Sequence, residues 1–426
     1  MKEELLHFIW QSKTLMKQSL VTVSGEPLQI IRPGTLNSDA GPDFFNAKIK
    51  LGNTLWAGNI EIHIKSSDWI NHRHQSDKKY NSVILHVVYF NDTEIFYENG
   101  KPIPCLELRN FIPPLTLKKH HQLLLNKYTV ACEKIFEVPP SPIITNFLER
   151  LLVERLEDKC GAIESLLIQN NKNWETVFYQ LTAKYFGMKT NAQPFDWLAQ
   201  NLPLSVLTKH KNSLIQVESL VFGVAGFLNS QNKNDYINLM EREFTFLRTK
   251  YQLKTMDKSI WKFSKTRPAN FPTVRLAQFA SLIFHSSHLF SKCLTVKNII
   301  ELKALYNIPQ NTKLNPFAFI DNNTRNKTSA FGTDAVETLL INTVLPILFV
   351  YGKQNHREEL SEKTILFYEQ LKPENNTIVR FWKELGLDAK NAFESQALIQ
   401  LKNNYCANLK CLSCIIGNQI LLNGYD

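Results

Sequence analysis

The first part of the chain changes its hydrophobic period shortly after it begins. Residues 3–17 place apolar side chains three and four positions apart, which predicts an amphipathic helix. From about residue 20, apolar and polar residues alternate, as they do in strands with one buried face. The alternating runs lie at 21–23, 28–30, 49–51, 60–64 and 83–87, separated by turns rich in Gly, Pro and Asn. This part is therefore predicted to contain one helix, a sheet of five to seven strands and a short helix at 75–80.

Alternation ends at Pro113-Pro114, and helical spacing follows a second proline cluster at 139–142. Helices are predicted at 143–156, 174–186, 214–228, 273–289, 335–351, 358–371 and 377–385. The fold class is therefore predicted to be α+β, with an N-terminal mixed sheet and flanking helices followed by a mostly α-helical domain. The expected divisions are an α/β domain at 1–113, a Pro-containing connector at 114–142, a helical domain at 143–400 and a Cys-containing segment at 401–426.

Composition and charge add to this picture. The chain has 426 residues, of which 44% are hydrophobic, which favours two or three globular domains over disorder. The net charge is +10, and the whole excess lies in 114–426, because residues 1–113 carry twelve basic and twelve acidic side chains. A polyanionic partner would therefore be expected to bind the second part.

No segment has the pattern of an export signal or a membrane span. Polar residues interrupt every apolar run near the start of the chain. The most apolar window, 339–350, is shorter than the roughly 20 residues that a spanning helix needs. Seven cysteines at low density favour reduced thiols, so a cytoplasmic location is expected.

The most informative segment lies between residues 41 and 65. Side chains two apart on a strand share a face, so Glu61, His63 and Lys65 are predicted to project together. Asp43 opens the partner strand of the same hairpin, which would bring its carboxylate near Glu61. Two carboxylates can hold magnesium or manganese, and a bound metal can activate water and stabilise a phosphoryl group. Phosphodiester hydrolysis is the reaction that these groups suit best.

This arrangement resembles the PD-(D/E)XK nuclease core over roughly residues 1–110. Asp43 matches the first acidic position of that motif and Glu61 the second, and both would bind the metal. His63 stands where the family usually has Lys, and Lys65 on the same face would be a substitute for orienting the attacking water. The resemblance implies the element order helix, three strands, helix and strand, with Glu3 or Glu4 of the first helix as additional metal ligands.

Two other interpretations remain open for this segment. The replacement of Lys by His63 favours a catalytically inactive scaffold that keeps the nuclease-like fold and binds nucleic acid or protein. Alternatively, imidazoles are frequent zinc ligands, and a zinc-dependent hydrolase would use His63, His72, His74 or His86. His86, between apolar neighbours, is predicted either to be a core histidine or to point at the same site.

The chain also resembles an uncharacterised bacterial family of conserved hypothetical proteins. The resemblance rests on the segments GNIEIHIKSSDW, VILHVVYFND, ESLVFGVAGFL and RPANFPTVRLAQFA and on the terminal cysteine pattern. It implies an intracellular bacterial protein and no established activity.

The terminal cysteines form a ligand-like pattern. Cys406, Cys411 and Cys414 follow the spacing C-x4-C-x2-C, and three thiolates at this spacing need a fourth ligand to complete a metal site. Cys132 is the preferred fourth ligand, ahead of Cys105, Cys160 and Cys293. The spacing resembles plant-type iron–sulfur ligation, and zinc is the alternative. The interpretation without a metal is a set of small buried thiols.

A basic stretch interleaved with aromatic residues lies at 241–275. Its cations include Arg248, Lys250, Lys254, Lys258, Lys262, Lys265 and Arg267. Cations neutralise phosphates and aromatic rings stack on unpaired bases, so this stretch is a candidate nucleic-acid surface. A solvated helix with an aromatic core face would show the same pattern.

Overall fold

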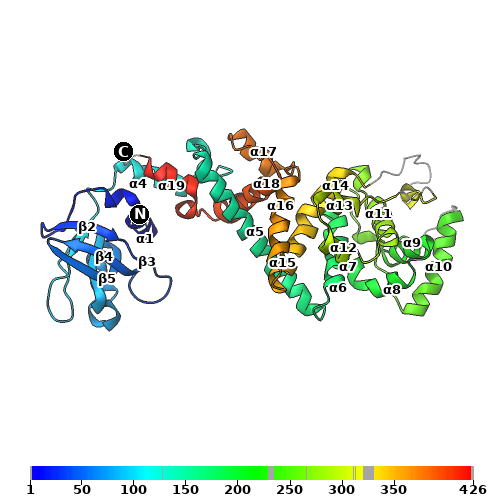
Figure 1. Cartoon of the computed structure of the whole chain (residues 1–426), viewed down its shortest axis with the longest axis horizontal. Helices are drawn as coiled ribbons and strands as arrows, with labels where there is room; N and C mark the ends of the chain where they lie inside the picture. Colours follow the sequence, from blue (N-terminus) through cyan, green and yellow to red (C-terminus); the bar gives the residue numbers. More distant parts are fainter. Residues whose placement is uncertain are drawn as a thin grey trace. The chain divides into compact units, whose positions relative to one another are not determined.

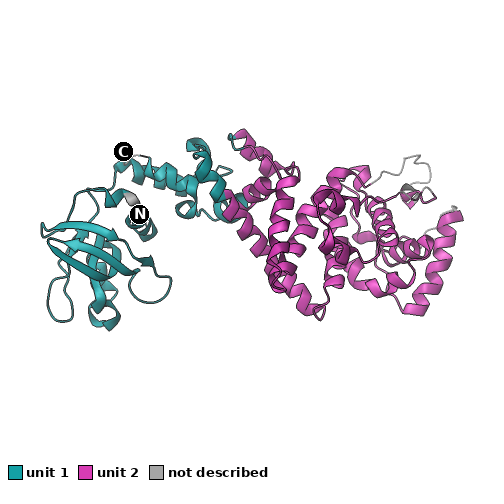
Figure 2. Ribbon diagram, in the orientation of Figure 1, with its two compact units in different colours: residues 1–147, 385–387, 401–426 teal, residues 148–384, 388–400 magenta. Residues whose placement is uncertain are grey.

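The computed structural model describes residues 2–126, 128–228, 235–264, 266–309, 311, 313–319 and 331–423. It divides the chain into two compact units (Figure 2). Unit 1 contains residues 1–147, 385–387 and 401–426, and unit 2 contains residues 148–384 and 388–400. The predicted connector at 114–142 and the predicted terminal segment at 401–426 both fall within unit 1. The fold is α+β, with a mixed sheet in the N-terminal part and a mostly helical remainder (Figure 1), as the sequence predicts.

Unit 1 is built on a seven-stranded sheet in the order β1-β2-β4-β5-β6-β7, with β3 paired to β4. The strands are β1 (Leu20–Val21), β2 (Pro27–Arg32), β3 (Thr35–Leu36), β4 (Phe44–Leu51), β5 (Thr54–Lys65), β6 (Val83–Phe90) and β7 (Cys105–Glu107). Strand β4 pairs antiparallel with both β2 and β5, whereas β5 pairs parallel with β6, and β6 parallel with β7. The sheet is therefore mixed, and β5 lies at the change from antiparallel to parallel pairing.

The registers of β5 decide which polar side chains meet. Phe44 pairs with Ile60 across the β4–β5 hairpin, so Asp43, one residue before Phe44, lies beside Glu61. On the other side, Glu61 pairs with His86 of β6. Gly58 permits this close pairing, because a Cβ at that position would lie 2.4 Å from the Ile84 Cγ2 atom.

The predicted helix at 3–17 is divided in two. Helix α1 (Glu3–Gln11) buries Leu5, Leu6, Ile9 and Trp10 in the core of the sheet, and α2 (Lys13–Met16) follows it. Ser12 separates them with an extended backbone, and its hydroxyl donates to the Ile9 carbonyl at 2.6 Å. A serine that bonds the end of the preceding turn ends the helix, although the apolar spacing continues.

Short helical turns link β5 to β6. They are α3 (Asp68–Asn71) and the 3-10 turns η1 (His74–Ser76) and η2 (Lys78–Ser82), where the sequence predicts one short helix at 75–80. Ser66 fixes the start of this connection, because its hydroxyl donates to the Thr93 carbonyl at 2.7 Å and accepts from the backbone N–H groups of Asp92 and Thr93.

The end of the chain packs within unit 1. It forms the π-helical turn η8 (Leu401–Cys406), the 3-10 turn η9 (Cys411–Ser413) and α19 (Ile415–Leu422). Helix α19 packs on α4 (Pro114–Leu125), and the Thr116 hydroxyl donates to the Leu421 carbonyl at 3.1 Å. The 3-10 turn η3 (Glu133–Ile135) lies between α4 and α5.

Unit 2 is helical throughout the residues that the structure describes. Its helices are α5 (Ser141–Gln169, which begins in unit 1), α6 (Trp174–Phe186), α7 (Met188–Asn201), α8 (Leu204–Lys209), α9 (Leu214–Val224), α10 (Asp235–Tyr251), η4 (Lys258–Ile260), η5 (Pro268–Asn270), α11 (Pro272–His285), α12 (Leu289–Thr295), α13 (Ile299–Ala304), η6 (Pro316–Phe319), α14 (Thr333–Leu339), η7 (Leu340–Val344), α15 (Leu345–Gln354), α16 (Glu358–Gln370), α17 (Thr377–Glu384) and α18 (Ala392–Gln400). The continuous helical run 333–354 is long and apolar enough to cross a membrane, but 72% of its most apolar window is buried inside the protein.

Candidate metal centre

Asp43 and Glu61 are held together by backbone hydrogen bonds. The Asp43 N–H donates to Glu61 Oε2 at 3.1 Å, and Asp43 Oδ2 accepts from the Ile62 N–H at 2.9 Å. The Glu61 side chain is 6% exposed and that of Asp43 is 25% exposed. The two carboxylates therefore have fixed positions, and the Asp43 carboxylate is the more open to solvent.

Four histidines gather beside Glu61, two of them next to its carboxylate and two in contact with His63. His63 Nδ1 lies 2.8 Å from His86 Nε2, and His63 Nε2 lies 3.1 Å from His72 Nδ1. Glu61 Oε1 lies 3.5 Å from His63 Nε2 and 3.2 Å from His74 Nε2. Strands β5 and β6 thus supply two imidazoles, and the connection between them supplies the other two.

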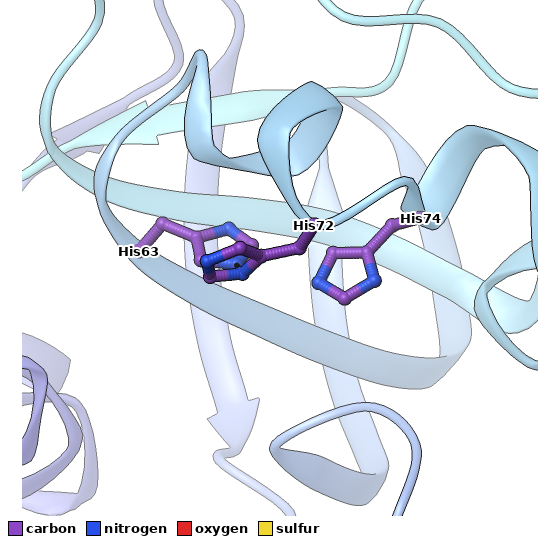
Figure 3. A group of neighbouring side chains, drawn as sticks. All are labelled: His63, His72 and His74. Atoms are coloured by element: carbon purple, nitrogen blue, oxygen red, sulfur yellow. Dashed lines mark hydrogen bonds between the residues drawn. The ribbon is translucent and has the colours of Figure 1, made fainter.

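The connection between β5 and β6 is shaped to present His72 and His74 on the same side. Arg73, between them, has a left-handed backbone conformation with φ of 60°, which reverses the chain locally. The His74 ring stacks on Tyr80 with ring centroids 3.8 Å apart, which fixes its orientation. Figure 3 shows the three rings of His63, His72 and His74 as neighbours.

Helix α1 contributes a further imidazole and a carboxylate to this face. His7 Nε2 lies 3.3 Å from Asp43 Oδ2. Glu3, one helical turn earlier, is half-buried, and its pKa is raised by burial and by the charge of Asp43. Glu4 is exposed. Of the two predicted helix acids, Glu3 is thus the one whose charge acts on this site.

Burial sets the protonation of the inner groups. It lowers the pKa of His63 to about 4 and that of His86 well below its usual range, so both rings stay neutral at pH 7. Burial also raises the pKa of Glu61, because it disfavours the charged carboxylate. A cation bound beside Glu61 would offset this cost. For His7, burial lowers the pKa, but the hydrogen bond and charge of Asp43 outweigh it, and the net pKa is raised.

These groups have the composition of a transition-metal site. One nitrogen from each of His63, His72 and His74 lies within 4.8 Å of the others. Neutral imidazoles and a carboxylate suit zinc or manganese, whereas magnesium prefers oxygen ligands. The donor set of this face therefore fits a divalent transition metal, with Glu61 as the adjacent carboxylate.

The predicted site residues are brought together unequally. The Asp43 N–H donates to Glu61, His63 and His74 lie beside the Glu61 carboxylate, and His72 and His86 contact His63. Lys65 is exposed, and its backbone N–H donates to Asp68. Sequence reasoning missed His7, although its spacing of four residues from Glu3 places both on one face of the first helix.

The four predicted cysteine ligands also meet in unit 1. Cys132, Cys406, Cys411 and Cys414 line one small cavity. The other three cysteines lie in β7, α5 and α12.

The basic stretch of unit 2 combines exposed cations with aromatic residues that range from buried to exposed. Its cations Arg248, Lys250, Lys254, Lys258, Lys262 and Arg267 are exposed, and Lys265 lies outside the described residues. In contrast, Phe244 and Trp261 are buried, and the Trp261 Nε1–H donates to the Ala225 carbonyl. Phe246 is 63% exposed beside Lys250, which places one aromatic ring among the cations at the surface.

Comparisons with known proteins identify a family and no relative of known activity. No curated protein and no solved structure matches the chain. The model of a family described as a protein of unknown function, DUF2851, matches residues 3–377, which include the whole acidic and histidine cluster. This match confirms the resemblance to an uncharacterised family, and the chain belongs to DUF2851.

Proposed function

We propose that the protein is a metal-dependent phosphodiesterase of the nuclease type, acting on nucleic acid through the face formed by β5, α1 and the β5–β6 connection. The observation that carries this proposal is the convergence of Asp43 and Glu61 with the imidazoles of His63, His72 and His74. Such a donor set suits a divalent metal that activates water and stabilises charge on a phosphoryl group.

Each residue has a role that follows from its position. Glu61 and the three imidazoles would hold the metal, and His86 fixes the His63 ring from behind through the 2.8 Å contact. Asp43, the more exposed carboxylate, would complete the ligand set on the solvent side. His7, whose Nε2 atom faces Asp43, would carry a proton at the edge of the site and give it to the leaving oxygen.

The order of elements supports a nuclease-like fold for unit 1. Helix α1, strands β2, β4 and β5, helix α3 and strand β6 occur in the order that the PD-(D/E)XK resemblance implies, with the short elements α2, β1, β3, η1 and η2 between them. Asp43 and Glu61 stand on neighbouring strands, as the two acids of that motif do. The imidazole at position 63 departs from the motif, and it favours manganese or zinc over magnesium as the metal.

Cleavage assays test the proposal. Purified protein would be incubated with linear, nicked, branched and single-stranded DNA and with RNA, in separate reactions with Mn²⁺, Zn²⁺ or Mg²⁺. We expect metal-dependent cleavage by the wild type and by His121→Ala, which changes an exposed histidine of α4, and none by Glu61→Gln. Absence of cleavage on every substrate, or equal cleavage by Glu61→Gln, would overturn it.

The alternative function is a non-catalytic scaffold that retains the same fold. The observation that favours it is that His63 contacts two other imidazoles, where the nuclease motif has a lysine. This alternative predicts binding of nucleic acid without cleavage at any metal concentration.

The exposed cations of 248–267 are our proposed contact for nucleic acid. Lys250 lies 5.9 Å from the ring centroid of the exposed Phe246, which would offer charge and a stacking surface together. Replacing Arg248 and Lys250 by Glu should weaken binding and reduce its dependence on salt. Unchanged binding by this double variant would remove the surface from the proposal.

A further inference from the structure

Four of the seven cysteines of this protein line one cavity in unit 1. They are Cys132, Cys406, Cys411 and Cys414, and the rest of the lining comes from Ala131, Tyr405, Lys410 and Gly417. All four are free thiols rather than disulfide partners. We infer that these four cysteines ligate an iron–sulfur cluster, which fastens the end of the chain to the segment around residue 132.

The local structure holds each sulfur at the end of a helical turn. Cys132 directly precedes η3, Cys406 ends η8, Cys411 begins η9, and Cys414 directly precedes α19. Leu409 has a left-handed backbone, with φ of 52°, which turns the chain between Cys406 and Cys411. The four ligand positions therefore lie on rigid turns rather than on a free tail.

Gly417 shows how tightly this region is packed. A Cβ at residue 417 would lie 2.1 Å from the Cys411 carbonyl oxygen, so only glycine allows α19 to approach η9 this closely. This approach fixes Cys411 and Cys414 relative to each other. A preformed pair of this kind is what a cluster with fixed bond lengths requires.

The sequence spacing of the cysteines favours a cluster over a single zinc ion. Three of them follow the pattern C-x4-C-x2-C, and Cys132 is a distant fourth cysteine at the same cavity. This spacing is that of plant-type iron–sulfur ligation, in which four cysteine thiolates hold the cluster.

The position of the cavity indicates a structural role. Beside it, the Lys402 ammonium donates to the Thr129 carbonyl, and the amide of Asn423 donates to Glu137 at 3.1 Å. A cluster would add a covalent connection between the segment 129–137 and residues 406–414. Its loss should loosen residues 406–414 from the segment 129–137.

The test is spectroscopy and metal analysis of anaerobically purified full-length protein. We expect brown protein with a broad absorption band in the visible range, iron and acid-labile sulfide in equal amounts, and loss of both in Cys132→Ser and Cys411→Ser. Cys160→Ser, at a half-buried cysteine of α5, is the matched control and should keep the colour. Stoichiometric zinc without iron, absence of both metals, or full colour in Cys411→Ser would each overturn the inference.

A second measurement covers the case in which a cysteine variant fails to fold. Wild-type protein would be stripped of iron with chelator and reductant and then digested with a protease at low concentration. We expect faster cleavage within 401–423 after stripping and protection after reconstitution with iron and sulfide. Equal cleavage before and after stripping would contradict the clamping role. Glu61→Gln should keep the colour, so failure of the proposed hydrolase function does not affect this test.

Discussion

Asp43 and Glu61 position each other: the backbone N–H of Asp43 donates to the Glu61 carboxylate, and the Asp43 carboxylate accepts from the N–H of the residue after Glu61. This reciprocal pair joins the start of β4 to the middle of β5. It places two carboxylates side by side at the edge of the histidine cluster. The arrangement connects the stability of the hairpin with its proposed metal chemistry, and the two contributions can be separated by mutation.

Asp43→Ala and Asp43→Asn separate these contributions. Alanine removes the acceptor for the buried Ile62 N–H, which should cost about 1–3 kcal/mol of unfolding free energy. Asparagine keeps an acceptor oxygen, so it should cost less while still removing the negative charge. Denaturant unfolding and manganese titration of both variants check this prediction, and equal stability of Asp43→Ala and wild type would contradict it.

Gly58→Ala should disturb the pairing of β5 and β6. The added Cβ would lie 2.4 Å from Ile84 Cγ2 and 2.7 Å from the Ser82 carbonyl oxygen. Overpacking of this kind typically costs about 1–3 kcal/mol. Gly161→Ala is the matched control, because its Cβ meets no atom within 4 Å and α5 is helical there, so stability should be unchanged or slightly higher. Thermal unfolding followed by circular dichroism measures both, and equal melting temperatures for the two variants would refute the steric argument.

The unfolding free energy of unit 2 should increase as the pH rises from 7 to 9, because of Lys159 in α5. Its ammonium nitrogen is buried without a hydrogen-bond partner in the described structure, and burial together with the charge of Arg155 lowers its pKa to about 7. The unfolded chain keeps this proton up to about pH 10.4, so the folded state binds fewer protons in that range and gains stability with pH. The gain attributable to Lys159 is on the order of 2 kcal/mol between pH 7 and 9.

Lys159→Met isolates this contribution from other titrating groups. The variant should be more stable than wild type at pH 7, and the difference should shrink toward pH 9, because the wild-type lysine is then neutral when folded. Urea unfolding of both proteins at the two pH values supplies the comparison. A stability difference that stays constant with pH would show that the pKa of Lys159 is not lowered in the folded protein.

The parts of the fold that depend on local pattern follow from the sequence. The alternation at 60–64 predicts β5, and the hairpin spacing places Asp43 near Glu61, as the structure shows. The helix at 174–186 is observed with the predicted bounds. These features depend on the spacing of apolar side chains and on turn residues, and both are set by residues that are close together in the sequence.

Features that depend on tertiary packing could not be predicted from the sequence pattern. The spacing of apolar residues in 3–17 does not predict the break at Ser12, where the serine hydroxyl bonds to the Ile9 carbonyl and the helix ends. The approach of His72 and His74 to Glu61 depends on the left-handed turn at Arg73, and non-glycine residues rarely adopt it. The return of residues 401–423 to unit 1 joins positions far apart in sequence, which a single chain does not encode in any local pattern.

Manganese titration by calorimetry of chelator-treated protein tests the central claim most directly. Manganese accepts imidazole and carboxylate ligands and competes weakly for thiolates, so it reports on the Asp43, Glu61 and histidine face. We predict one ion per chain for wild type and for His121→Ala, and at least a roughly ten-fold loss of affinity in Glu61→Ala and in His63→Ala. No binding to wild type at millimolar manganese, or unchanged affinity in Glu61→Ala, would contradict the account.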